Sequence, residues 1–173
     1  MFTKLILIAL ILGPITVGSL PPTKINKPVI LEERVGIKPY TDVFDDKQLK
    51  CLTDNIYFEA RNEKDVGKKA VAFVTLNRTK DNDYPNTICG VVYHKTNKYN
   101  CQFSWTCTKS RAIKYPDLYK KCKQIAVNVL MNYGHVPDVT KGATYFRRHN
   151  VRQHWERNIK VTFTTRNHVF YRI

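Results

Sequence analysis

An apolar stripe at helical spacing, between residues 49 and 60, constrains the fold more than any other stretch of the chain. The stripe consists of Leu49, Leu52, Ile56 and Ala60. Spacings of three and four residues place these side chains on one face of an α-helix. Asp45 or Asp46 precedes the stripe, and an aspartate at that position can cap the first turn. We therefore expect a helix that begins near residue 45 and buries this face.

The octapeptide IYFEARNE, residues 56–63, closes the expected helix and places a carboxylate among apolar side chains. Glu59 follows Tyr57 and Phe58 and precedes Ala60. Burial disfavours the charged form of a carboxyl group and raises its pKa, and an acid that is still protonated near neutral pH can donate a proton to a leaving group. Glu59 is therefore a candidate general acid. The alternative is an amphipathic helix whose acids form surface pairs with Arg61.

Length, composition and charge limit the class of protein. The chain has 173 residues, of which 43% are hydrophobic, so one domain with its own core and a leader can be built without a metal. The formal net charge of +15 favours a polyanionic partner, which can be a nucleic acid, an anionic membrane or an anionic cell envelope.

The N-terminal 44 residues have the composition of a leader and a linker. Lys4 is followed by the apolar run LILIALILGPITVG, residues 5–18, which predicts a secretory signal over residues 1–20. The run is short for a membrane-spanning helix and is interrupted by Gly13 and Pro14, so an uncleaved signal-anchor that tethers the protein to the inner membrane is the alternative. Residues 21–44 contain four prolines and are expected to form an extended linker or arm.

Five cysteines are compatible with an exported protein. They are Cys51, Cys89, Cys101, Cys107 and Cys122. In an exported chain we expect most of them to be oxidised, and the absence of a CxxC pair argues against a zinc cluster. Cys89 and Cys101 flank a polar loop and are the pair we favour, while the other pairings stay open.

Helical patterns continue along the middle of the chain. A second helix is expected from about Asp65, and it ends at the turn signal DNDYP, residues 81–85. Residues 87–93 favour a short helix over a strand, and residues 95–100 a polar loop. Pro116 begins a further helix that Gly134 ends.

Strand patterns dominate the C-terminal third. Residues 143–147 form one candidate strand, and residues 159–165 and 168–171 predict a hairpin around Arg166 and Asn167. Because helices come first and a small antiparallel sheet comes last, the fold class we predict is α+β, in a domain that spans residues 45–173.

Short motifs in a fixed order carry a family resemblance. They are IYFEAR (56–61), Gly67, AVAFVTLNR (70–78), YPNTICGVVY (84–93), CQFSW (101–105), ATYF (143–146), Trp155 and HVFYR (168–172). In this order the chain resembles the SleB/CwlJ-type cell wall hydrolases, a family that includes spore cortex-lytic enzymes and phage and bacterial relatives. The resemblance implies a mostly helical, lysozyme-like catalytic domain that acts on peptidoglycan glycan strands, with Glu59 as its catalytic acid. The sequence departs from the family at Asn62 and near Arg166 and Asn167, where relatives often carry glycine.

The acids near Glu59 bear on the mechanism. Glycoside cleavage commonly uses two carboxylates, and Glu63 would lie one helical turn from Glu59. We interpret Glu63 as a surface acid, and a second carboxylate in the cleft is the alternative. A single acid fits lytic transglycosylation, in which Glu59 protonates the glycosidic oxygen after MurNAc and then accepts the proton of the C6 hydroxyl, leaving a 1,6-anhydro end. Hydrolysis by water, as in an N-acetylmuramidase, is the alternative.

Four further residues are candidate substrate contacts. They are Gln102, Ser104, Tyr145 and Trp105. The two polar side chains can hydrogen-bond sugar groups and the two aromatic ones can line a groove, with Phe103 turned into the core; a structural role is the alternative for each. For Asn77 and Arg78, at the end of a helix, we expect capping or buried hydrogen bonds.

Other chemistries find less support in the sequence. His149, His154, His168 and Glu156 are near one another in the chain, but no HExxH or GxSxG motif occurs, so we expect neither a metal nor a serine nucleophile. No other cofactor is expected.

A non-catalytic basic protein that binds nucleic acid or the anionic envelope is the alternative from another functional class, yet no nucleic-acid-binding motif is present. We therefore expect peptidoglycan and the anionic envelope as partners, no nucleic acid, and a location in the periplasm or cell wall.

Overall fold

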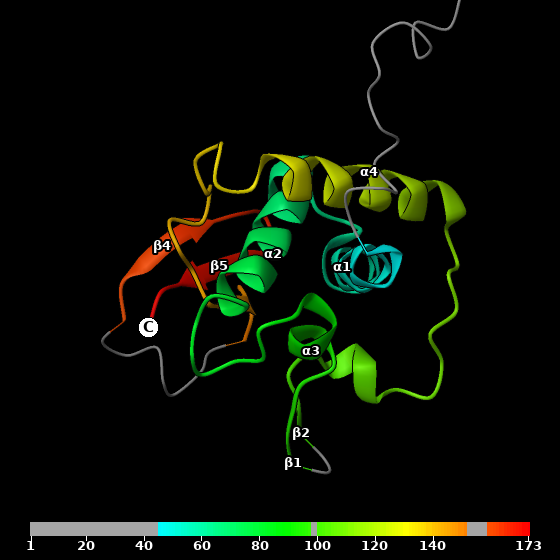
Figure 1. Ribbon diagram of the computed structural model, residues 1–173, viewed down its shortest axis with the longest axis horizontal. Coiled ribbons are helices and arrows are strands. Elements are labelled where there is room, and N and C mark those ends of the chain that lie inside the picture. The colour runs from blue at the N-terminus through cyan, green and yellow to red at the C-terminus, as the bar shows by residue number, and fades with distance from the viewer. Residues whose placement is uncertain (1–44, 98–99, 152–158) are drawn as a thin grey trace, which may run out of the picture. The chain divides into compact units, whose positions relative to one another are not determined.

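A computed structural model of the protein describes residues 45–97, 100–151 and 159–173 (Figure 1). The helices in these ranges are α1 (Asp46–Ala60), α2 (Asp65–Arg78), α3 (Ile88–Val92) and α4 (Pro116–Asn132), with a 3₁₀ helix at Ser104–Cys107. The strands are β1 (Lys95–Asn97), β2 (Asn100–Cys101), β3 (Tyr145–Arg148), β4 (Val161–Thr164) and β5 (His168–Tyr171). This order confirms the predicted α+β class. The predicted leader and linker lie outside the described residues, as do His154, Trp155 and Glu156.

Helix α1 is the central element, and its apolar stripe is buried as predicted. Its first turn is capped by Asp45, whose side chain accepts a hydrogen bond from the backbone N–H of Lys47 at 2.8 Å. Leu49, Leu52 and Ile56 are at most 2% exposed. The helix packs against α2, α3 and α4, which surround it in Figure 1. Its C-terminal turn, which carries Glu59, is therefore held on a rigid core.

The other predicted helices form with the expected ends. Helix α2 begins at Asp65, and the short α3 is capped by the Thr87 hydroxyl, which accepts from the N–H of Gly90 at 3.0 Å. Helix α4 has Pro116 in its first turn, where a missing N–H costs nothing. Gly134 follows α4 with a φ of +83°, a conformation that glycine adopts without strain.

The C-terminal strands form a three-stranded antiparallel sheet in the order β3-β5-β4. The predicted hairpin is thus confirmed as β4 and β5. The central strand β5 is buried along its whole length, and Phe170 packs with Val71 and Val74 of α2. In the register of β3 and β5, Arg148 lies opposite His168, so both residues sit at the same end of the sheet.

Two predictions about the middle of the chain were wrong. Residues 95–101 are not a plain polar loop, because β1 and β2 pair as a short antiparallel hairpin. The disulfides are Cys51–Cys89 and Cys101–Cys107, not Cys89–Cys101. Cys51 of α1 faces α3, and its Cα lies 5.3 Å from that of Cys89, within the range that a disulfide spans.

The fifth cysteine, Cys122, is a buried free thiol in α4. Within the described residues, no helix has the length and apolar character needed to cross a bilayer.

Candidate active site

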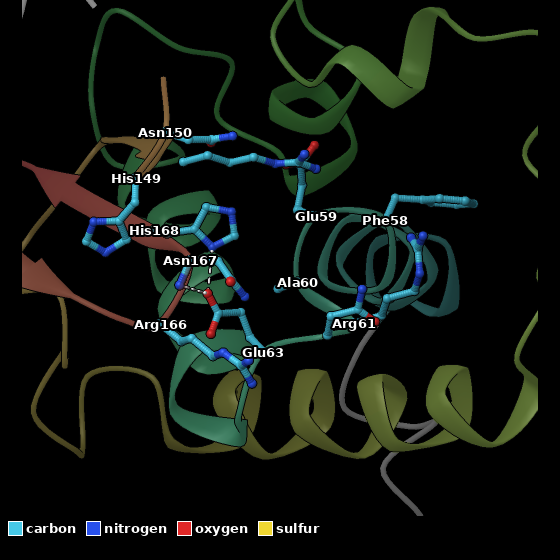
Figure 2. A pocket seen from close by; sticks show the side chains of 12 residues that line it. Phe58, Glu59, Ala60, Arg61, Glu63, His149, Asn150, Arg166, Asn167 and His168 are labelled. Atoms are coloured by element: carbon cyan, nitrogen blue, oxygen red, sulfur yellow. Dashed lines mark hydrogen bonds and ion pairs between the residues drawn. The ribbon is translucent and has the colours of Figure 1, made fainter. Parts of the chain in front are cut away.

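Glu59 lies where two pockets meet. The first pocket has a volume of about 450 Å³ and is lined by the end of α1, the residues after β3 and the turn before β5 (Figure 2). The second has a volume of about 540 Å³ and is lined by β2, the chain that follows it, and β3. Glu59, Arg148 and His168 line both pockets. The two pockets therefore adjoin at these three residues, and together we call them the groove.

The surroundings of Glu59 make it a weak acid. Burial raises its pKa to about 7, although the positive charges of Arg148 and Arg78 act in the opposite direction. Loss of water around the carboxyl group disfavours its charged form, which is the effect that the apolar neighbours in the sequence predicted. Near neutral pH a substantial fraction of Glu59 is protonated and can donate a proton.

Arg78 is a buried cation at the edge of the second pocket. Its Nε donates to the carbonyl oxygen of Thr144 at 2.7 Å, and its guanidinium lies over the rings of Tyr84 and Tyr145. In the amide orientation that satisfies both groups, the Gln102 side-chain oxygen accepts from both terminal nitrogens at 3.1 Å. Our expectation of buried hydrogen bonds for this residue is confirmed.

Asn77 confirms the same expectation. Its side-chain nitrogen donates to Asp138 Oδ2 at 2.8 Å and to the carbonyl oxygen of Ala143 at 3.0 Å. These bonds attach the end of α2 to the loop that leads into β3, and so they fix the strand that lines the groove.

The structure brings three of the four candidate substrate contacts to the second pocket. Gln102, Ser104 and Tyr145 line it together with Glu59. Phe103 is 3% exposed and packs in the core, as expected.

Trp105 occupies a different place from the one we expected. It is 7% exposed and is not among the residues that line either pocket. Its indole N–H donates to Asn55 Oδ1 at 3.1 Å, and its ring stacks on Phe58 at 4.6 Å. Because Phe58 lines the first pocket, Trp105 supports the groove wall from behind.

Glu63 is not the surface acid that we expected. It is 6% exposed, and its Oε1 accepts hydrogen bonds from the N–H of Asn167 at 3.0 Å and His168 Nδ1 at 3.0 Å (Figure 2). The same oxygen accepts a third hydrogen bond from Thr165 Oγ1 at 2.8 Å. The physical reason is that α1 ends at Ala60, so Glu63 does not continue the helical face. The chain turns and directs this carboxyl group toward the turn between β4 and β5.

Among the described residues, no group of three His, Cys, Asp or Glu side chains is placed to hold a metal ion. His168 is instead bonded to Glu63, and His149 Nε2 lies 3.0 Å from the carbonyl oxygen of Thr165. His154 and Glu156, which the sequence placed in the same candidate group, lie outside the described residues.

The comparisons with known proteins decide the family. The model of the cell wall hydrolase family matches residues 62–171. The chain belongs to the cell wall hydrolase family. This confirms the resemblance seen in the motifs, and it means that the protein is an enzyme of peptidoglycan degradation. The matched range begins after Glu59, so the match does not itself include the candidate acid.

Solved structures show the same fold for this cell wall hydrolase. The catalytic domain of the Bacillus cereus SleB protein is 22% identical with a TM-score of 0.58, over 75% of this chain and 92% of that one. The catalytic domain of the germination-specific lytic transglycosylase SleB from Bacillus anthracis is 22% identical with a TM-score of 0.57, over 75% of this chain and 97% of that one. A comparison with curated protein sequences gave no significant match.

Sequence reasoning did not identify Arg148 as a groove residue of this cell wall hydrolase. It considered His168 only as a possible metal ligand and interpreted Glu63 as a surface acid. Nothing in the sequence around Arg148 indicates that it lies in the groove, because its position depends on the pairing of β3 with β5. His168 belongs to the motif HVFYR, which marked the strand but not the direction of the side chain.

Proposed function

We propose that this cell wall hydrolase cleaves the MurNAc–GlcNAc backbone as a lytic transglycosylase with Glu59 as its single catalytic carboxylate. The observation that carries the proposal is the position of Glu59 at the junction of two pockets, with a pKa of about 7. The engagement of Glu63 Oε1 by three hydrogen-bond donors supports a mechanism that needs one carboxylate. A hydrolytic N-acetylmuramidase would need a second group to activate water.

The reaction follows from one proton on Glu59. With a glycan strand in the groove, Glu59 donates this proton to the glycosidic oxygen after MurNAc, and the bond from that oxygen to C1 breaks. The C6 hydroxyl oxygen of the same sugar then bonds to C1, and its proton passes to the Glu59 carboxylate. The products are a GlcNAc end with a free hydroxyl and a 1,6-anhydroMurNAc end, and the enzyme is regenerated without water.

Arg78 and Arg148 support the charged form of Glu59 that exists between the two proton transfers. Both cations lower the pKa of Glu59 against the effect of burial, so they stabilise the carboxylate after it has released its proton. Gln102, Ser104 and Tyr145, in the second pocket, bind the sugar on one side of the scissile bond. In this proposal Trp105 acts only through its contact with Phe58.

We also propose that the enzyme reaches its substrate by export. The predicted signal or signal-anchor at residues 1–20 and the two disulfides of the domain are features of a protein that works in an oxidising compartment. If the leader is retained, it tethers the enzyme to the inner membrane before release. The positive charge of the chain then favours the anionic envelope over free solution.

Glu59→Gln tests the catalytic assignment. The amide preserves the shape of the side chain but cannot transfer a proton, so wall lysis should fall about a hundredfold to ten-thousandfold. Turbidity loss of purified cell walls measures the rate, and circular dichroism with a thermal melt reports the fold. Asp83→Asn, an equivalent change at an exposed turn outside both pockets, is the matched control and should lyse walls at the wild-type rate. Wild-type lysis by folded Glu59→Gln protein would contradict the assignment.

A further inference from the structure

A buried pair that the proposed reaction does not use lies beside Glu59. His168 Nδ1 is 3.0 Å from Glu63 Oε1, and the two side chains are 3% and 2% exposed. The partners are 105 residues apart in the chain. A buried carboxyl group and imidazole need each other as hydrogen-bond partners, so the pair fixes both side chains.

The pair determines which nitrogen of His168 carries the proton. Glu63 Oε1 is an acceptor that already receives bonds from Thr165 Oγ1 and the N–H of Asn167, so Nδ1 of His168 is the donor to it. In the neutral ring Nε2 is then the acceptor. Burial lowers the pKa of His168, against the opposing effect of Glu63 and with the support of Arg148 and His149, so the surroundings of the ring favour its neutral form.

Aromatic side chains hold the ring in place. The ring of Phe146 lies edge-on to the imidazole at 5.3 Å, and that of Phe170 lies at 6.2 Å. His168 thus has a carboxylate at one nitrogen and aromatic rings against its sides. A ring held in this way cannot rotate to a different hydrogen-bond partner without breaking several contacts.

The imidazole also borders the groove. His168 lines both pockets together with Glu59, and in Figure 2 its ring lies between Glu63 and Glu59. Glu63 occupies the Nδ1 side, so Nε2 is the nitrogen available to a sugar bound at Glu59. A neutral acceptor at this place is suited to a hydroxyl group, which can donate one hydrogen bond to it.

We propose that His168 Nε2 accepts a hydrogen bond from the C6 hydroxyl of the MurNAc residue bound at Glu59, and that Glu63 is the positioning residue that holds the imidazole for this contact. The inference rests on the proposed transglycosylation. In the bound substrate this contact orients the hydroxyl oxygen toward C1. Once Glu59 has given its proton to the glycosidic oxygen, the O–H turns from Nε2 to the Glu59 carboxylate, which takes the proton as the bond from O6 to C1 forms. His168 neither gains nor loses a proton over the cycle.

The contact decides which nucleophile reaches C1. A hydroxyl group that is already oriented reacts as part of the same molecule, and loss of that orientation costs about a hundredfold for a displacement of about 1 Å. Without the contact, water from the open groove competes for C1. The proportion of 1,6-anhydro ends among the new ends therefore reports the contact, whereas a purely structural role of His168 would change only the amount of active enzyme.

His168→Asn is the variant that tests the contact. Its side-chain N–H can replace Nδ1 as a donor to Glu63, but it has no atom at the position of Nε2. We expect kcat to fall about tenfold to a hundredfold with KM nearly unchanged, and the fraction of reducing ends to rise relative to 1,6-anhydro ends in mass spectra of digested peptidoglycan. His135→Asn, at an exposed histidine outside both pockets, is the matched control and should leave both quantities at wild-type values.

A second variant covers the case in which His168→Asn does not fold. Glu63→Met fills a similar volume but removes the oxygen that accepts from Nδ1, so neither the tautomer nor the direction of the imidazole is held. We expect the same shift from anhydro to reducing ends. Folded variants with an unchanged product ratio, whether or not the rate falls, would overturn the inference and leave the proposed function intact. A wild-type digest with reducing ends alone would instead overturn the transglycosylation itself.

Discussion

At the scale of single residues, the acid strength of Glu59 is set by opposing effects. Burial raises its pKa, while Arg148 and Arg78 lower it, and the result is about 7. Burial without the two cations would give a pKa that is higher still. The nearby cations alone would give a carboxylate that is already ionised at neutral pH. The position of Glu59 between the hydrophobic core and a basic groove thus gives an acid that can donate and recover a proton.

This balance predicts the pH dependence of the enzyme. In the proposed mechanism the protonated form of Glu59 is the active one, so kcat/KM should fall as the pH rises through about 7. Arg148→Gln removes a charge that lowers this pKa. The pH at which kcat/KM falls should therefore be higher in this variant than in the wild type. The measurement is kcat/KM against pH on soluble glycan fragments.

The control for the pH experiment is Lys114→Gln. It removes the same charge from an exposed residue outside both pockets and should leave the pH at which kcat/KM falls as it is in the wild type. If kcat/KM already falls near the ordinary pKa of a glutamate, or if Arg148→Gln does not change the pH at which it falls, then the surroundings of Glu59 do not set its pKa in the way we describe.

At the scale of elements, the sequence predicted what depends on neighbouring residues and missed what depends on distant ones. The helix that carries Glu59 follows from an apolar period and a capping aspartate, and the hairpin of β4 and β5 follows from strand patterns around a turn. Both are local signals. The pairing of Cys51 with Cys89 depends instead on how α3 packs against α1, which no spacing of cysteines reveals.

The same limit explains the errors at the site. Glu63 was interpreted as a surface acid, with a second carboxylate in the cleft as the alternative, but its partners come from the turn before β5. Trp105 was expected in the groove because aromatic side chains often line one, and its partner Asn55 is 50 residues away. The residue types in the sequence indicated a polar groove with one acid. The directions in which the side chains point depend on the tertiary structure and could not be predicted from the sequence.

The approach of α2 to Glu63 gives a prediction at this scale. A Cβ at Gly67 would lie 2.8 Å from Glu63 Cβ and 2.9 Å from its Oε2. Helix propensity alone would favour Gly67→Ala by up to about 1 kcal/mol, but overpacking costs about 1–3 kcal/mol. We expect overpacking to dominate, because Glu63 cannot move without losing its hydrogen bonds. The free energy of unfolding in urea should therefore fall, and wall lysis with it.

Lys69→Ala, two residues further along α2, is the control for this measurement. Its backbone position is helical as well, and it should change the free energy of unfolding by no more than about 0.5 kcal/mol. A Gly67→Ala protein as stable and as active as the wild type would show that Glu63 is free to shift and that its position is not constrained by α2.

At the scale of the whole molecule, we expect the positive charge of the chain and its groove to contribute to different steps, the first to binding of the wall and the second to cleavage of the glycan. The formal net charge of +15 acts over the entire surface and attracts polyanions of many kinds. In the proposed reaction, the groove provides the acid that breaks a glycosidic bond. We therefore expect retention on the wall and cleavage of the glycan to be separable properties of the protein.

The charge predicts salt-dependent binding to cell walls. Exposed charges are screened as the ionic strength rises, with a Debye length of about 10 Å at 0.1 M and about 3 Å at 1 M salt. The fraction of protein that sediments with purified walls should fall between these conditions. Glu59→Gln protein should be used, because it leaves the walls undigested. Binding that does not change with salt would show that the charge is incidental to retention.

The central claim is that Glu59 carries a transglycosylation of the glycan backbone, and mass spectrometry of the fragments released from purified peptidoglycan tests it most directly. We predict that wild-type enzyme produces fragments ending in 1,6-anhydroMurNAc, each lighter by one water than the corresponding reducing-end fragment, and that Glu59→Gln protein produces almost none. Glycan strands left intact, cleavage confined to the peptide stems, or new ends that are all reducing would contradict the account.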